Sequence, residues 1–196
     1  MCNQILSKRP LITGMGAALV DLFADVDEPT LDELGSPKGS MTLVDAARAD
    51  TLRAGVTVHT YRPGGSAANT VAGLAGLGMQ GGFIGKIGDD ELGRVFQDSL
   101  TDLGVTFPVT PCDSADHPTG NCLVLVTPDA ERTMHTLLGA SVTTAKVDLD
   151  AKLLNVTGIL FCEGYVWDSP TARAAFLEAA ARVKSGGGRI GFSLSD

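Results

Sequence analysis

The segment from Pro63 to Gly93 constrains the fold more than any other part of the chain, because it joins a glycine pair to two successive helix patterns. It reads PGGSAANTVAGLAGLGMQGGFIGKIGDDELG. Ser66 to Leu77 predicts a helix with Ser66 as its cap, and its many alanines and glycines predict close packing against a neighbouring element. A short buried strand follows at GGFIGKIG, and Asp89 to Leu103 predicts a second helix with acidic residues in its first turn.

Strand and helix patterns alternate along most of the chain. Buried strands are predicted from about Pro10 to Met15, in NVTGILFCEGY and in GRIGFSLSD, and a helix is predicted over SPTARAAFLEAAARVKSGG. This alternation predicts an α/β fold with a mostly parallel sheet and helices on both faces. The polar stretch from Glu28 to Asp50 predicts an irregular loop.

Two regions do not fit the alternation. GVTVHTYRP has the pattern of a strand, and NCLVLVT and RTMHTLL predict a hairpin around a Pro-Asp-Ala-Glu turn. We therefore expect a small separate β layer with strands at roughly 40–63 and 107–138. Its strands belong to the same single domain, which is a size that 196 residues can support.

Composition excludes several classes of function. Hydrophobic residues make up 44% and charged residues 19%, which is typical of a globular chain. The net charge of −8 and the absence of a basic run argue against a nucleic-acid partner. No apolar stretch approaches the roughly 20 residues of a membrane span, and the N-terminus does not have the pattern of a signal peptide.

The cysteines predict free thiols rather than a metal site. They form no CxxC pair and have no metal-like spacing with the three histidines. The cysteines are Cys2, Cys112, Cys122 and Cys162, and the histidines are His59, His117 and His135. Free thiols are typical of a reducing compartment, so we expect a cytoplasmic protein.

Four residues are the first candidates for a ligand site. Gly64 and Gly65 allow close approach to the backbone at a helix start, and Asn69 lies in the first turn of that helix. We expect Asp21 just after the first strand, at the edge where α/β folds bind ligands. A carboxylate and an amide together suit neighbouring sugar hydroxyls. The alternatives are a strand-end turn at Asp21, a plain turn at the glycine pair, and an internal capping role for Asn69.

Other motifs favour structural roles. Gly85-Lys86-Ile87 is not a phosphate-binding loop, because no serine or threonine follows the lysine. Gly14-x-Gly16 is not a dinucleotide fingerprint, because Leu19 occupies the third glycine position. The acidic run at residues 89–91 indicates a favourable helix N-terminus. Glu163, Tyr165 and Trp167 follow a predicted strand and are candidates either to line a pocket or to pack.

The order of these motifs resembles the N-terminal signature of the PfkB family of carbohydrate and nucleoside kinases. The similarity rests on GGSAANTVAGLAGLG followed by GFIGKIGDDELG. PTGNCLVLVTPDAERTMHTLLGAS and FCEGYVWD are similar to bacterial members described as adenosine or sugar kinases. The resemblance implies a ribokinase-like fold, in which a β-sheet lid covers the sugar site and explains the separate β layer.

The resemblance also implies roles for individual residues. Asp21 matches the aspartate that binds sugar hydroxyls, and Gly64, Gly65 and Asn69 match the substrate-contacting Gly-Gly and Asn. Thr119 and Gly120, at the start of a lid strand, are weaker substrate-binding candidates, and Glu163 is included with them. The implied activity is ATP- and magnesium-dependent phosphorylation of the primary hydroxyl of a sugar or nucleoside, such as ribose or adenosine.

The catalytic residues of the family are not found in this sequence. The resemblance places a Gly-Ala-Gly-Asp motif and an Asn-x-x-Glu motif, which serve the base and magnesium, in a C-terminal half. Neither motif occurs here, so we expect a chain truncated on its C-terminal side, with ATP and Mg²⁺ bound mainly by the missing half. The alternatives are a non-catalytic sugar- or nucleoside-binding module, a homodimer paired through the lid edge, and a fragment that does not fold alone.

Overall fold

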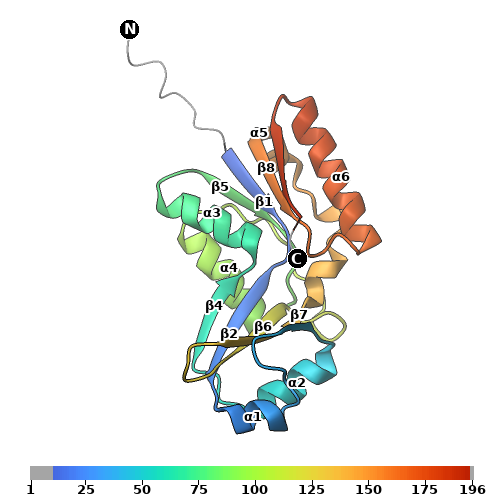
Figure 1. The fold of residues 1–196 in the computed structure, drawn as a ribbon. Helices are drawn as coiled ribbons and strands as arrows, with labels where there is room; N and C mark the ends of the chain where they lie inside the picture. The colour runs from blue at the N-terminus through green and yellow to red at the C-terminus, as the bar shows by residue number, and fades with distance from the viewer. Residues whose placement is uncertain (1–10, 195–196) are drawn as a thin grey trace.

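The computed structural model describes residues 11–194 and shows two β-sheets, one above the other in Figure 1. The first sheet has four parallel strands in the order β5-β1-β8-β9. Its strands are β1 (Leu11–Met15), β5 (Gly81–Ile84), β8 (Thr157–Glu163) and β9 (Arg189–Ser193). The predicted parallel sheet is therefore confirmed.

Helices cover both faces of this parallel sheet, as the alternation predicts. They are α3 (Ser66–Gly76) and α4 (Glu91–Asp102) on one face and α5 (Ala151–Val156) and α6 (Pro170–Ser185) on the other. The α3 helix approaches β1 closely, because a Cβ added at Gly14 would lie 2.8 Å from the Ala67 carbonyl oxygen. The small residues of α3 allow this approach.

The second sheet is mixed and has five strands in the order β3-β7-β6-β2-β4. These are β2 (Leu19–Asp25), β3 (Met41–Leu43), β4 (Thr60–Gly64), β6 (Gly120–Val126) and β7 (Arg132–Leu137). The β6–β7 pair is the antiparallel hairpin that the sequence predicts. By contrast, β3 pairs with β7 and β4 pairs with β2, so residues 40–63 form two separate edge strands rather than a hairpin.

The segment from Glu28 to Asp50 contains regular structure, so the prediction of an irregular loop is wrong. It forms α1 (Glu28–Glu33), then β3, and then the start of α2 (Ala46–Ala54). Asp27 and Asp45 cap the two helices by accepting from Thr30 N and Arg48 N. Each helix buries a single residue, Leu31 or Leu52. Such short surface helices show almost no apolar periodicity, which is the signal that sequence reasoning uses.

Two helix starts also differ from the prediction. The α3 helix is capped at Gly65 and receives no side-chain cap from Ser66, because the Ser66 hydroxyl donates to Glu163 instead. The α4 helix begins at Glu91, and Asp90 is its N-cap, accepting from Gly93 N at 2.8 Å.

Two apolar clusters hold the sheets and helices together. One joins α3 and α4 to the mixed sheet, α1 and α2, and it includes three mutually packed rings, Phe83, Phe96 and Phe107, with centroids 5.3–5.7 Å apart. The other packs α5 and α6 against the opposite face of the parallel sheet. Two short 3₁₀ turns, η1 (Gly139–Thr143) and η2 (Lys146–Asp148), link β7 to α5. Within residues 11–194, no helix is both long and apolar enough to cross a membrane.

Candidate functional site

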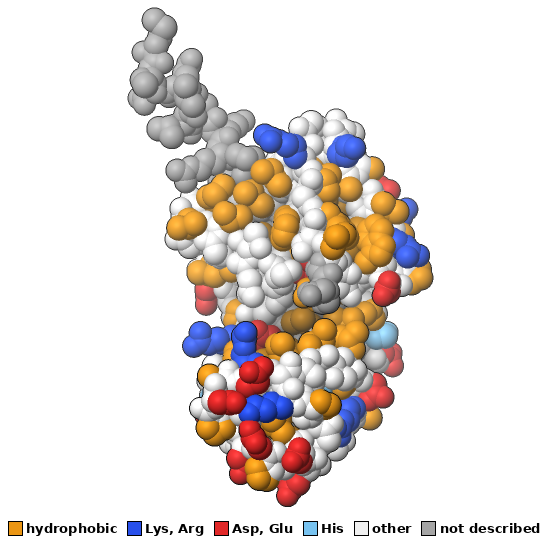
Figure 2. Space-filling view, in the orientation of Figure 1, with side chains coloured by type: hydrophobic (Ala, Val, Ile, Leu, Met, Phe, Trp, Pro, Cys, Tyr) orange, Lys and Arg blue, Asp and Glu red, His pale blue; other side chains and the backbone are white. Residues whose placement is uncertain are grey.

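A cavity of about 450 Å³ lies between the two sheets, at the carboxyl ends of the parallel strands. We call it the inter-sheet cavity. It is lined by residues of the mixed sheet (Leu19, Asp21, Met41, Leu43, Cys122, Met134, Thr136 and the adjoining Leu138), of the α3 start (Gly65, Ser66 and Asn69) and of the segment after β8 (Gly164, Tyr165 and Asp168). Figure 2 shows hydrophobic side chains gathered along this junction, with charged side chains concentrated below it.

Strand register explains how the mixed sheet contributes its wall. Asp21 on β2 pairs with Cys122 on β6, which pairs with Thr136 on β7. Thr136 in turn pairs with Leu43 on β3. Paired residues in adjacent strands face the same side of a sheet, so one row of four side chains meets the cavity. The wall is apolar apart from Asp21 and Thr136.

Asp21 follows β1 along the chain but lies inside β2 of the mixed sheet, and it lines the cavity at the carboxyl ends of the parallel strands. Its carboxyl group lies over Gly64, where a Cβ would come within 2.4 Å of Oδ1. Burial raises the pKa of Asp21, and the nearby Arg132 guanidinium partly offsets this effect. The Asp21 carboxyl group forms no hydrogen bond or ion pair with any other residue in the range 11–194. Its carboxyl oxygens are therefore available to a ligand.

The start of α3 forms the opposite wall. Gly65 has a φ of 91°, in the left-handed region, and a Cβ there would lie 2.5 Å from the Ala17 carbonyl oxygen. Only glycine fits this combination of backbone angle and close approach. Asn69 lies one turn later, with an exposed side chain on the cavity. Asp21 and Asn69, which are 48 positions apart by number, thus line one cavity, as the site prediction requires.

Glu163 lies beneath the cavity rather than on its surface. Its side chain is fully buried, and its carboxyl oxygens accept from Ala17 N at 2.6 Å, from Ala67 N at 2.7 Å and from the Ser66 hydroxyl. A direct contact with a ligand would require the carboxyl group to leave these donors. The free N–H groups that the helix start is expected to offer are thus occupied in part by the chain itself.

The two weaker candidates lie outside the cavity lining. Thr119 is fully buried, and its hydroxyl accepts from Gly88 N at 2.9 Å. Gly120 is enclosed, because a Cβ would come within 2.5 Å of Leu19 Cδ2 and 2.7 Å of the Leu138 carbonyl oxygen. Both residues support the walls of the cavity, and their predicted contact with substrate remains a prediction.

Of the two aromatic candidates after β8, Tyr165 lines the cavity with a half-exposed ring. Trp167 packs instead between Phe176 and Phe192, with ring centroids 6.2 and 5.3 Å away. Sequence reasoning missed Cys122, Met134 and Thr136, although the two-residue period of the predicted hairpin places alternate side chains on one face. It had no signal for Met41 and Leu43, because their segment lacks a strand pattern.

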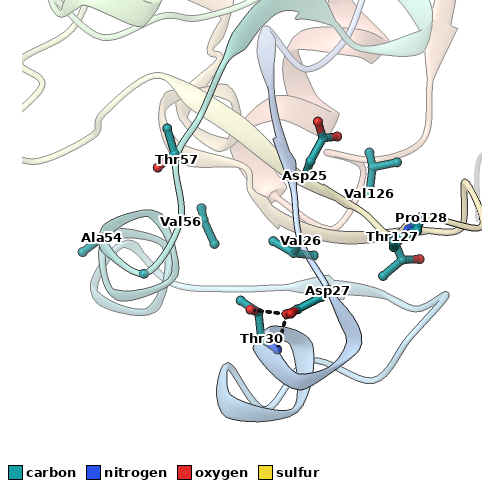
Figure 3. Close-up of a pocket in the computed structure, with 11 residues that line it drawn as sticks. Asp25, Val26, Asp27, Thr30, Ala54, Val56, Thr57, Val126, Thr127 and Pro128 are labelled. Carbon is teal, nitrogen blue, oxygen red and sulfur yellow. Dashed lines mark hydrogen bonds between the residues drawn. The ribbon is translucent and has the colours of Figure 1, made fainter.

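A second hollow of about 670 Å³ lies at the outer end of the mixed sheet, near α1 and α2 (Figure 3). Its polar groups already serve the fold. The Asp27 carboxylate caps α1 by accepting from both the backbone N–H and the hydroxyl of Thr30. Asp25 Oδ2 lies 3.5 Å from His59 Nε2. The Asp27 carboxyl group in this hollow is therefore already engaged in capping α1.

The ammonium group of Lys86, in the Gly-Lys-Ile segment, is already paired within the fold. Lys86 is bound in a nearly buried ion pair with Asp148, at 2.5 Å. Within residues 11–194, no group of three or more His, Cys, Asp or Glu side chains is arranged to hold a metal.

The fold and the cavity together define a class: an α/β protein whose mixed sheet covers a cavity at the carboxyl ends of a parallel sheet. Comparison with known proteins identifies the family. The model of the pfkB family carbohydrate kinases matches residues 40–192, and the chain belongs to this family.

Relatives and solved structures agree with this assignment. The chain is 34% identical over 135 residues to the aminoimidazole riboside kinase of Salmonella typhimurium, and 29% identical over 133 residues to the 5-dehydro-2-deoxygluconokinase of Shouchella clausii. Its structure is similar to the adenosine kinase of Sinorhizobium meliloti, with a TM-score of 0.86 and 37% identity. It is also similar to a probable sugar kinase of Rhizobium etli, with the same TM-score of 0.86 and 33% identity. The ribokinase-like fold is therefore confirmed.

The chain spans only part of these proteins. The alignments cover 67–68% of this chain but 41% of each of the two curated relatives. The structural matches cover 96% of this chain and 57% of each of the two solved chains.

Proposed function

We propose that this chain forms the substrate-binding part of an ATP-dependent kinase that phosphorylates the primary hydroxyl of a sugar or nucleoside. The observation that carries the proposal is the free Asp21 carboxyl group facing the same cavity as Asn69. A carboxylate accepts from two neighbouring hydroxyls, and an amide both donates and accepts, so the pair suits a ring with adjacent hydroxyl groups.

The charge around the cavity favours an uncharged ligand. Asp21 and Asp168 line it, and Glu163 accepts hydrogen bonds at the N-terminus of α3 just behind it. An anionic group such as a phosphate would meet like charge at the position where a helix N-terminus usually binds anions. This arrangement supports a substrate that has not yet been phosphorylated, as a kinase requires.

The apolar side of the cavity supports a substrate larger than a simple pentose. Met41, Leu43 and Met134 line the mixed-sheet wall, and Tyr165 lies after β8. Flat heterocycles bind well to polarisable methionine and aromatic surfaces. We propose a ribonucleoside as the preferred substrate, with the ribose at Asp21 and Asn69 and the base against the apolar wall. Contacts with ATP and magnesium, and the catalytic base, are assigned to sequence other than this chain.

Isothermal titration of the chain with adenosine and with D-ribose tests the proposal. Asp21→Asn should weaken binding about tenfold or more, because a charge-assisted hydrogen bond contributes about 1.5–3 kcal/mol. Asp25→Asn is the matched control, since Asp25 lies on the same strand outside the inter-sheet cavity and should leave the affinity unchanged. Absence of binding to either ligand, or equal affinities for wild type and Asp21→Asn, would refute the proposal.

A kinase assay of the gene product with ATP, magnesium and adenosine or ribose separates the two functional hypotheses. Phosphorylation of either compound supports the kinase. Tight binding without turnover supports a sugar- or nucleoside-binding module that has lost catalysis.

The mixed sheet also supports a proposed homodimer. Its edge strand β3 has three exposed residues, including Met41 and Leu43, and an exposed edge can pair with a second copy. Sedimentation equilibrium tests this, and a monomer at all concentrations would exclude it.

A further inference from the structure

Glu163 has an unusual environment for a carboxylate. Among residues 11–194, it is the only acidic side chain that is fully buried. Its two oxygens meet three donors, namely the backbone N–H of Ala17, the backbone N–H of Ala67 and the Ser66 hydroxyl. Burying a charged group is costly unless it is hydrogen-bonded, so these contacts satisfy a group that the fold would otherwise exclude.

The donors come from both connections between the two sheets that adjoin the cavity. Ala17 lies between β1 of the parallel sheet and β2 of the mixed sheet. Ser66 and Ala67 begin α3 directly after β4 of the mixed sheet. Glu163 itself ends β8 of the parallel sheet. One carboxylate is therefore hydrogen-bonded to both connecting segments, which we call crossings. The β1–β2 crossing leads to Asp21, and the β4–α3 crossing leads to Asn69.

Two glycines show how closely this junction is packed. A Cβ at Gly16 would lie 2.4 Å from the Glu163 carboxyl carbon, so only glycine leaves room for the acid. A Cβ at Gly65 would lie 2.5 Å from the Ala17 carbonyl oxygen, so the two crossings also touch each other. The position of one crossing thus determines the position of the other.

We propose that Glu163 is a positioning residue for the substrate site, which holds Asp21 and Asn69 in register by binding the backbone of Ala17 and Ala67. It acts through these two segments and does not contact the ligand. The inference rests on the proposed function, because it assigns to Glu163 the task of aligning the sugar-binding pair.

Glu163→Gln tests the inference with almost no change in volume. The new amide group presents N–H donors where one carboxylate oxygen had accepted, so either Ala17 N–H or Ala67 N–H loses its acceptor. We expect hydrogen exchange at one of these two amides to accelerate roughly tenfold or more in NMR experiments. We also expect the Kd for adenosine or ribose to rise roughly 10- to 100-fold, because a small misplacement of aligned groups is costly.

Thr157→Val is the matched control. Thr157 begins the same strand, is buried, and bonds to the Thr13 hydroxyl at 2.8 Å at the end of β8 opposite to Glu163. This variant should lower the thermal midpoint and leave the Kd unchanged. Glu163→Asp is the second variant. The aspartate keeps the charge, but its side chain is one methylene too short to reach both crossings. It should therefore show the same changes in hydrogen exchange and Kd, and it provides the test if Glu163→Gln does not fold.

The outcomes separate this inference from the proposed function. Faster exchange with a raised Kd supports the positioning role. Unchanged exchange at both amides, or faster exchange with a wild-type Kd, overturns it while leaving the proposed function intact. If the wild type binds neither ligand, the proposed function and the ligand-aligning role both fail, and the exchange data then show only whether Glu163 fixes the two crossings.

Discussion

Replacement of Gly64 by alanine should abolish the contribution of Asp21 to ligand binding without disturbing the fold. The φ of Gly64 lies outside the left-handed region, so alanine is allowed by the backbone. The added Cβ, however, would lie 2.4 Å from Asp21 Oδ1, 2.7 Å from Cγ and 2.8 Å from Oδ2. These distances are all shorter than van der Waals contact, so the carboxyl group must turn away from its position in the cavity.

The size of the effect follows from the hydrogen bonds that Asp21 would make with a sugar. Loss of one charge-assisted bond, at about 1.5 kcal/mol, weakens binding about tenfold. Loss of both weakens it by roughly a hundredfold or more. Isothermal titration with adenosine or ribose measures the change, and thermal unfolding shows whether the variant remains folded.

Gly73→Ala is the matched control for this experiment. Gly73 is exposed in the middle of α3, and no atom lies within 4 Å of the position its Cβ would occupy. The substitution should leave the Kd unchanged and stabilise the protein by about 0.5–1 kcal/mol, because alanine is the better helix former. The combination of Gly64→Ala with Asp21→Ala should bind no more weakly than Asp21→Ala alone. A wild-type affinity for Gly64→Ala would refute the reasoning.

Two further predictions concern stability. Burial raises the pKa of Asp21 in the folded state, so ionisation of this group costs stability as the pH rises through the folded pKa. Asp21→Asn should therefore unfold at a higher temperature than wild type at neutral pH. The difference in thermal midpoint should disappear below the ordinary carboxyl pKa of 3.8. A variant that is less stable than wild type at neutral pH would contradict this prediction. Thr119→Val should destabilise the fold by about 1–3 kcal/mol, because the buried Gly88 N–H loses its acceptor. Its Kd should match that of the wild type in the same titration, and a weaker affinity would instead make Thr119 a ligand contact.

Much of the parallel sheet was predictable because its signals are local. Apolar strands that alternate with amphipathic helices specify a parallel arrangement whatever the rest of the chain does, and the β6–β7 hairpin follows from its turn sequence. The α1 and α2 helices were not predictable in this way. Each buries one leucine, and their capping aspartates are common in loops as well.

Only part of the candidate site was predictable in its residues, and its geometry was not. The glycine pair, Asn69 and Asp21 were identified from their residue types and from their order along the chain. The strand that carries Asp21 was not predicted, because Gly14 and Gly16 indicate a turn and give no information about whether a strand follows or which sheet it joins. The apolar wall of Met41, Leu43 and Met134 depends on pairing between distant strands.

Glu163 shows most clearly the difference between what the sequence predicts and what only the structure shows. Its sequence position, at the end of a strand in an α/β pattern, is equally consistent with a ligand contact and with a packed residue. The structure shows a buried carboxylate that binds two backbone crossings 146 and 96 positions away along the chain. The sequence by itself determined the strands of the parallel sheet, the β6–β7 hairpin, the helices α3, α4 and α6, and the close packing of α3, because periodicity and glycine content act locally. Only the tertiary structure decided which side chains face the cavity and which support it, because hydrogen bonds between distant segments leave no local pattern.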